Sequence, residues 1–141
     1  MNVYFSCSLT GGRADEGVYA QIVDHLLARK VEVPTAHLAR AEVMALERVV
    51  DAHETYQRDI DWIEACDAVI AEVSTPSHGV GYEIAYALGL KKPVLACYRD
   101  GATVSKMITG NNHETLQVLV YSDPSTLLGE IDNFLDGAQA G

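Results

Sequence analysis

The sequence predicts a single α/β domain in which a mainly parallel, five-stranded sheet is flanked by helices. Apolar runs of strand length alternate along the chain with longer segments of helical pattern. This alternation favours parallel strands joined by right-handed helical crossovers. The 141 residues, 48% hydrophobic and 21% charged, have the length and composition of one globular domain, so we treat residues 1–141 as a single unit.

The first third of the chain supplies two predicted strands and one clear helix. A strand over residues 2–7 is followed by a helix over residues 14–29, whose apolar side chains recur at helical spacing. Val31–Val33 predicts a short second strand, ended by Pro34. Residues 36–51 favour helix in composition but have a loose pattern, so we expect a mobile or partly helical excursion there.

The middle of the chain carries the strongest signals. Residues 53–66 predict a helix with one apolar face, made by Tyr56, Ile60 and Ile63. The β-branched run over residues 68–73 predicts a buried central strand. Residues 80–90 then predict a helix, which Gly89 is suited to end.

The last third repeats the alternation. Strands are predicted over residues 93–98 and 116–121, with a short helix over 104–109 between them. Asp123 is a good N-cap with Pro124 at the first helical position, so a helix should run to about residue 135, followed by a fraying tail. With the strands 2–7 and 68–73 adjacent, the sheet would be Rossmann- or flavodoxin-like.

Charge and cysteine content exclude several classes of protein. A net charge of −10 argues against binding to nucleic-acid polymers or to an anionic membrane surface. The cysteines Cys7, Cys66 and Cys97 are odd in number and lack metal-site spacing, which indicates a reducing compartment. Met1 leads straight into the first strand, without a signal peptide or a membrane-length apolar stretch, so we expect a cytoplasmic protein.

Two loops at the carboxyl ends of the adjacent strands are candidate anion cradles. The first contains Ser8 and then Gly11, Gly12 and Arg13; the second runs from Ser74 to Gly79 into a helix N-terminus. Helix N-termini and glycine-rich turns offer unpaired N–H groups to phosphate, although a Gly-Gly turn is more often only a turn.

Two carboxylates should border the same crevice. Glu83 is predicted in or near the first turn of the helix, and Asp59 lies at the edge of the apolar face of the preceding helix. The alternatives are that Glu83 only stabilises the helix N-terminus and that Asp59 is a solvated acid paired with Arg58. Two carboxylates beside a sugar phosphate suggest glycosidic cleavage, in which one attacks the anomeric carbon and the other manages protons. The histidines lack metal-ligand spacing, so we expect neither a metal nor a cofactor.

Three segments occur in a recognisable order: Tyr4-Phe5 with Ser8–Arg13, then Gln57–Trp62, then Ala71–Glu83. They resemble the 2′-deoxynucleoside 5′-phosphate N-hydrolases of the nucleoside 2-deoxyribosyltransferase superfamily. The resemblance covers nearly the full chain, through Ser105-Lys106-Met107, and Gly79–Glu83 is its most specific part.

The resemblance implies that Glu83 is the nucleophile, that Asp59 handles protons, and that Tyr4 supports the catalytic carboxylate. It also implies a 5′-phosphate cradle, made by Ser8, Ser77 and Gly79. Ser105, with Met107 beside it, would be lent by the neighbouring subunit of a homodimer.

The activity so implied is hydrolysis of (2′-deoxy)nucleoside 5′-monophosphates to free base and (deoxy)ribose 5-phosphate through a covalent glycosyl-Glu83 intermediate. The alternatives are a nucleoside 2-deoxyribosyltransferase, a CMP-type ribonucleotide N-glycosidase and, least favoured, a noncatalytic nucleotide sensor.

Overall fold

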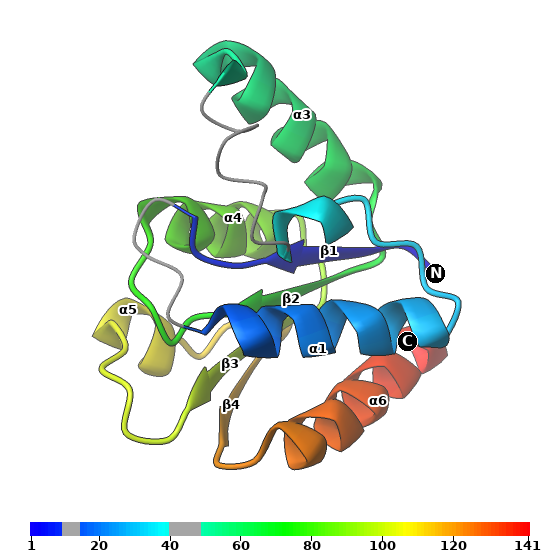
Figure 1. Cartoon of the computed structure of the whole chain (residues 1–141), viewed down its shortest axis with the longest axis vertical. Coiled ribbons are helices and arrows are strands. Elements are labelled where there is room, and N and C mark those ends of the chain that lie inside the picture. Colours follow the sequence, from blue (N-terminus) through cyan, green and yellow to red (C-terminus); the bar gives the residue numbers. More distant parts are fainter. Residues whose placement is uncertain (10–14, 40–48) are drawn as a thin grey trace.

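A four-stranded parallel sheet forms the centre of the protein (Figure 1). The computed structural model describes residues 1–9, 15–39 and 49–141. The strands are β1 (Val3–Ser6), β2 (Ala68–Glu72), β3 (Val94–Arg99) and β4 (Leu116–Tyr121). They lie side by side in the order β1-β2-β3-β4, and each neighbouring pair is parallel.

Helices cover both faces of the sheet (Figure 1). Helices α1 (Glu16–Ala28) and α6 (Pro124–Ala140) share one face, and α3 (Ala52–Ala65) and α4 (His78–Gly89) lie on the other. A short 3₁₀ helix, η1 (Ala36–Ala39), follows α1, and α5 (Lys106–Thr109) lies between β3 and β4. None of the helices in the described part of the chain is long and apolar enough to cross a membrane.

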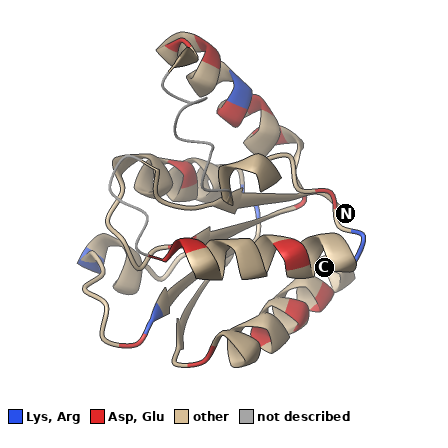
Figure 2. Cartoon of the chain, viewed as in Figure 1, with Lys and Arg blue, Asp and Glu red and all other residues tan. Residues whose placement is uncertain are grey.

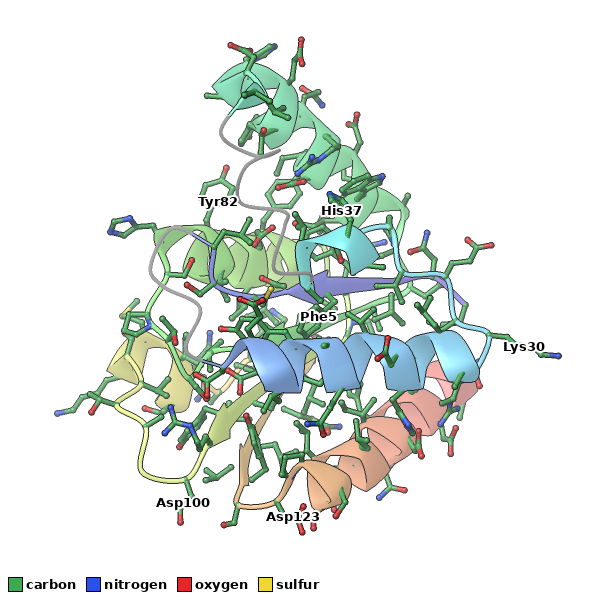
Figure 3. The ribbon with its side chains drawn as sticks, in the orientation of Figure 1. Phe5, Lys30, His37, Tyr82, Asp100 and Asp123 are labelled. Carbon is green, nitrogen blue, oxygen red and sulfur yellow. The ribbon has the colours of Figure 1, made fainter. Side chains whose placement is uncertain are left out.

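Each face of the sheet has its own apolar core, because strand side chains alternate between the two faces. On β1, Val3 and Phe5 pack toward α1 and α6, whereas Tyr4 packs toward α3 and α4. The ring of Phe5 meets that of Tyr19 edge to face, with 6.2 Å between centroids, and Figure 3 shows Phe5 between β1 and α1. All of β2 is buried, which explains its continuous apolar sequence.

The prediction of a fifth strand over Val31–Val33 is wrong. This segment makes only one isolated bridge to the sheet, between Asn2 and Glu32, with Glu32 donating to Met1 and accepting from Val3. The backbone N–H of Phe5, the next donor at that edge, is taken by the Thr35 side chain at 3.0 Å. Pro34 has no N–H with which to extend a ladder, so pairing ends after one bridge.

The chain end differs from the expected fraying tail, because α6 continues to Ala140. Arg29 of α1 donates hydrogen bonds to Asp132 at 2.6 Å and to Asp136 at 3.0 Å, which ties the last turns of α6 to α1. The start of α6 is as predicted, because Asp123 caps it by accepting from Ser125 N–H at 2.9 Å. Of the expected excursion over residues 36–51, Ala36–Ala39 is a 3₁₀ turn and residues 40–48 lie outside the described residues.

Candidate active site

The candidate site lies where the winding of the sheet changes direction. After β1 the chain passes to the Glu32 bridge on one side of β1, and it then returns to β2 on the other side. In open parallel sheets, ligands bind at such a point, beyond the carboxyl ends of the strands. Cys7 and Leu9, which follow β1, line one cavity at this edge together with Ser77 and Gly79, which follow β2.

Glu83 lies in the second turn of α4 and points at β1. The Tyr4 hydroxyl donates a hydrogen bond to its Oε2, and the Ser6 hydroxyl donates to its Oε1 at 2.9 Å. Helix α4 begins at His78, so its first turn carries no acidic residue. Because the helix dipole acts mainly within the first turn, a role for Glu83 limited to stabilising the helix N-terminus is not supported.

The electrostatic setting of Glu83 is that of a dehydrated carboxylate. Burial raises its pKa to about 7, although the hydrogen bonds from Tyr4 and Ser6 act in the opposite direction. The negative charge of Asp59 raises the pKa further, and the positive charge of Arg58 lowers it. Burial and the adjacent Glu83 hold the pKa of the Tyr4 phenol far above its ordinary value, so Tyr4 remains a hydrogen-bond donor. At neutral pH, Glu83 is therefore close to the midpoint of its titration.

Asp59 lines the same cavity as Glu83, as predicted from its place on α3. Its Oδ1 accepts from Arg58 Nε at 2.9 Å, so the pairing considered as an alternative is also present. The Arg58 guanidinium lies over the Trp62 ring, 4.9 Å from the ring centroid. Trp62 in turn meets the His37 ring edge to face, at 6.0 Å between centroids, which joins α3 to η1. Asp59 thus borders the cavity from a side that several contacts fix in place.

The cavity has a volume of about 330 Å³ and is lined by β1, η1, α3 and α4. Tyr56 of α3 and Tyr82 of α4 stand at its rim with their hydroxyl oxygens 3.3 Å apart, and both rings are about half exposed. Figure 3 shows Tyr82 rising from α4 toward α3. Sequence reasoning missed Ser6, Tyr56 and Tyr82 as cavity residues. The alternation of side chains along a strand would have placed Ser6 on the same face as Tyr4.

The predicted phosphate contacts are only partly brought together. Ser77 and Gly79 line the cavity at the start of α4, where Ser77 caps the helix by accepting from Val80 N–H at 3.4 Å. Ser8 is fully buried, and its hydroxyl has no hydrogen-bond partner among the described residues. Gly11, Gly12 and Arg13 lie outside the described residues.

Ser105 and Met107 do not reach the Glu83 cavity within one chain. They line a second cavity of about 540 Å³, between α4 and α5. Ser105 caps α5 by accepting from Met107 N–H at 3.1 Å, and the Met107 side chain is 83% exposed. Ser77, Val80 and Tyr82 line both cavities, so the two adjoin at the N-terminal half of α4.

Charge does not draw anions to this molecule as a whole. Figure 2 shows acidic residues on α1, α3 and α6, and the net charge is −10. A bound phosphate would therefore depend on local N–H and hydroxyl donors. Within residues 1–9, 15–39 and 49–141, no three His, Cys, Asp or Glu side chains are grouped as metal ligands.

Comparison with known proteins decides the family. The nucleoside 2-deoxyribosyltransferase family matches residues 3–123. This chain belongs to that family. It is 38% identical over 140 residues to the 5-hydroxymethyl-dUMP N-hydrolase of Rattus norvegicus, covering 96% of this chain and 82% of the relative. It is also 38% identical over 133 residues to a protein of Methanosarcina barkeri named "putative 2′-deoxynucleoside 5′-phosphate N-hydrolase 1", covering 94% of this chain and 84% of the relative.

Two solved structures share the fold of this family member, and one of them is an N-glycosidase. The CMP N-glycosidase of Clostridium botulinum superposes with a TM-score of 0.73 at 18% identity, over 95% of this chain and 99% of the other. A conserved protein of Enterococcus faecalis superposes with a TM-score of 0.62 at 21% identity, over 94% of this chain and 98% of the other.

Proposed function

We propose that this protein hydrolyses the N-glycosidic bond of 2′-deoxynucleoside 5′-monophosphates, releasing the free base and deoxyribose 5-phosphate. The names of two relatives that this chain matches over most of their length support this substrate class. The observation that carries the proposal is Glu83, held by two hydroxyl donors in a cavity that Asp59 also lines. A dehydrated carboxylate beside a second carboxylate suits a double displacement at an anomeric carbon.

In the first step, a carboxylate oxygen of Glu83 attacks C1′ of the sugar. The C1′–N bond breaks, its electron pair goes to the base, and a proton delivered through Asp59 neutralises the leaving base. The sugar is then an ester of Glu83.

In the second step, water attacks C1′ of the ester. Asp59 accepts a proton from that water, the bond from C1′ to Glu83 breaks, and the carboxylate is restored. Tyr4 keeps its proton throughout and stabilises the carboxylate before the attack and after the release.

The 5′-phosphate is assigned to the N-terminus of α4. Ser77 and Gly79 lie in the same cavity as Glu83, and the first amides of a helix lack intrahelical acceptors. Ser8, Gly11, Gly12 and Arg13 are proposed to complete the cradle from the loop after β1.

We assign the working unit as a homodimer in which Ser105 and Met107 reach the partner's site. In their own chain they line the cavity between α4 and α5 and not the Glu83 cavity, which supports this. The α4 face of β4 also leaves Val118 and Val120 exposed, at 37% and 47%. A twofold interface over this face would cover these valines together with Met107.

A cytoplasmic location completes the proposal. Cys7, Cys66 and Cys97 are buried and form no disulfide with one another, which suits a reducing compartment.

Two other activities fit the same crevice. A CMP-type N-glycosidase would accept a 2′-hydroxyl, and the superposition with the CMP N-glycosidase reflects the shared fold alone. A transferase would pass the sugar from Glu83 to a second base instead of water.

A panel of ribo- and deoxyribonucleoside 5′-monophosphates, assayed for released base, tests the proposal. We expect release from the deoxy series and none from the Glu83→Gln variant, because an amide is not a nucleophile here. A second base in the mixture that becomes glycosylated would identify a transferase. Binding without turnover by any nucleotide would identify a sensor, and near wild-type turnover by Glu83→Gln would remove the nucleophile assignment.

A further inference from the structure

Ser6 is a buried hydroxyl in direct contact with the proposed nucleophile. It is the last residue of β1, its side chain is 2% exposed, and its Oγ donates to Glu83 Oε1 at 2.9 Å. Tyr4, two residues earlier on the same strand, donates to the other carboxylate oxygen. Because side chains two apart on a strand share a face, one rigid element presents both donors to one carboxylate.

Two donors on two oxygens restrict the carboxylate more than one donor would. With only Tyr4 in place, the carboxylate could rotate about its last bond and remain bonded through a single oxygen. The Ser6 contact fixes the second oxygen and therefore fixes the plane of the group. Orientation of this kind determines whether a nucleophile meets the reacting carbon at a productive angle.

We propose that Ser6 is a positioning residue of the reaction, which holds the Glu83 carboxylate ionised and in a fixed plane for attack on the sugar. This inference rests on the proposed nucleophilic role of Glu83. This role differs from that of Ser8 and Ser77, which are assigned to the phosphate. Of these three serines, Ser6 is the one that donates a hydrogen bond to the Glu83 carboxylate.

The groups that face Glu83 predict the direction of the effect. Tyr4 and Ser6 contact it from β1, and Asp59 and Arg58 act on it from α3. The two hydroxyl donors and the Arg58 charge favour the ionised form, whereas burial and the Asp59 charge oppose it. Removing the Ser6 donor leaves a more basic carboxyl that is also less ordered.

The test compares Ser6→Ala, Ser6→Thr and the wild-type enzyme by pH profile. In Ser6→Ala we expect the acid limb of kcat/KM to move up by about one pH unit, as the loss of one hydrogen bond to a charged group implies. On the alkaline side of the limb, where Glu83 is ionised in both proteins, kcat should still be reduced by about tenfold with KM little changed. Ser6→Thr keeps the hydroxyl and should restore both.

A matched control exists on the opposite face of the sheet. The Tyr121 hydroxyl donates to the buried Glu72, so Tyr121→Phe also removes a hydroxyl from a buried carboxylate. The acid limb of Tyr121→Phe should stay where it is in the wild type. If Ser6→Ala does not fold, Ser6→Cys keeps the volume with a weaker donor and should show the same displacement of the limb to a smaller degree.

A direct titration of Glu83 separates this inference from the proposed function. The pKa of the carboxyl can be followed by carbon NMR in wild-type and Ser6→Ala protein without any substrate, with Glu83→Gln used to assign the signal. We expect a higher pKa in Ser6→Ala. An unchanged pKa, or an unchanged acid limb and kcat in an active Ser6→Ala enzyme, overturns the role of Ser6. A wild-type protein that hydrolyses no nucleotide would instead overturn the proposed function.

Discussion

Glu83 is subject to two opposing influences at the scale of single residues. Burial in the cavity raises its pKa, and the hydroxyl groups of Tyr4 and Ser6 limit that rise. Without the donors, the carboxyl would be protonated and unreactive at neutral pH; without the burial, it would be a hydrated carboxylate of low reactivity. Burial and the two donors together keep a substantial fraction of Glu83 ionised and poorly hydrated at neutral pH.

This setting predicts a pH-dependent cost to stability. The folded-state pKa of Glu83 is about 7, above the ordinary value of 4.5 that applies to the unfolded chain. Below about pH 4.5 the carboxyl is protonated in both the folded and the unfolded chain, so Glu83 has no ionisation cost there. As the pH rises from 4.5 toward 7, the unfolded chain ionises more readily than the folded protein, and the fold is increasingly destabilised. Glu83→Gln removes the charge, so its free energy of unfolding should exceed that of the wild type by about 2 kcal/mol at pH 8.

Urea denaturation at pH 4 and pH 8 measures this difference. The stabilisation by Glu83→Gln should nearly vanish at pH 4, and the exposed Glu130→Gln should show little change at either pH. An equal gain at both pH values would show that ionisation of Glu83 is not its cause.

Asp59 is expected to act on turnover more than on binding. Asp59→Asn keeps the size of the side chain but cannot transfer a proton, so kcat should fall by about 100-fold or more while KM changes little. Steady-state kinetics with a deoxynucleoside monophosphate measures both. Asp61→Asn is the control, because Asp61 is exposed on the same helix and bonds Gln57 at 2.8 Å. Normal kcat with a raised KM in Asp59→Asn would assign Asp59 to binding.

At the scale of elements, β1 and α4 each supply part of the candidate site. β1 brings hydroxyl groups to the carboxylate, and α4 brings the carboxylate itself together with a helix N-terminus. Ser77 caps the N-terminus of α4 and Glu83 lies in its second turn, so one rigid element carries both the proposed phosphate site and the proposed nucleophile. The fixed separation of Ser77 and Glu83 should therefore favour substrates in which the phosphate and C1′ are separated by a matching distance.

This arrangement predicts a strong requirement for the 5′-phosphate. A nucleoside without it leaves the donors at the start of α4 unpaired in the complex, so kcat/KM should fall by roughly 100-fold or more relative to the matching 5′-monophosphate. Parallel assays of each deoxynucleoside and its 5′-monophosphate measure the ratio. Similar rates for the two series would contradict the cradle and favour a transferase that acts on nucleosides.

At the scale of the whole molecule, the second cavity and the uncovered part of the sheet lie on the same side. Ser105 and Met107 line the cavity between α4 and α5, and Val118 and Val120 of β4 are exposed on the α4 face. The proposed homodimer would cover these residues and complete two sites at once.

Mixing two inactive variants tests the shared sites. If Ser105 acts in the partner's site, a dimer of one Glu83→Ala chain and one Ser105→Ala chain has one doubly mutated site and one intact site. An equal mixture allowed to exchange subunits should therefore regain about one quarter of wild-type activity. As controls, each inactive variant exchanged only with itself should regain no activity. A fully active monomer at assay concentration would exclude the dimer.

The sequence by itself determined most of the elements and the candidates for the reacting groups. Strand and helix patterns depend on side chains a few residues apart, so β1 to β4 and the main helices lie close to their predicted ranges. Tyr4, Asp59 and Glu83 were predicted from three separate segments that resemble a known family, and the structure places all three on one cavity. The failed strand at Val31–Val33 had the right composition, but its pairing was limited by Pro34 and by the Thr35 side chain.

Only the tertiary structure decided how these groups act on one another. Ser6 and Glu83 are 77 residues apart in sequence, and their hydrogen bond exists because β1 and α4 pack against each other. The raised pKa of Glu83 has burial as its main cause, and burial is a property of the packed molecule and not of any local segment. Ser105 was likewise predicted as a site residue, but only the fold shows that it lines a different cavity from Glu83 within its own chain. Contacts between distant segments depend on how whole elements pack, and local sequence patterns do not specify that packing.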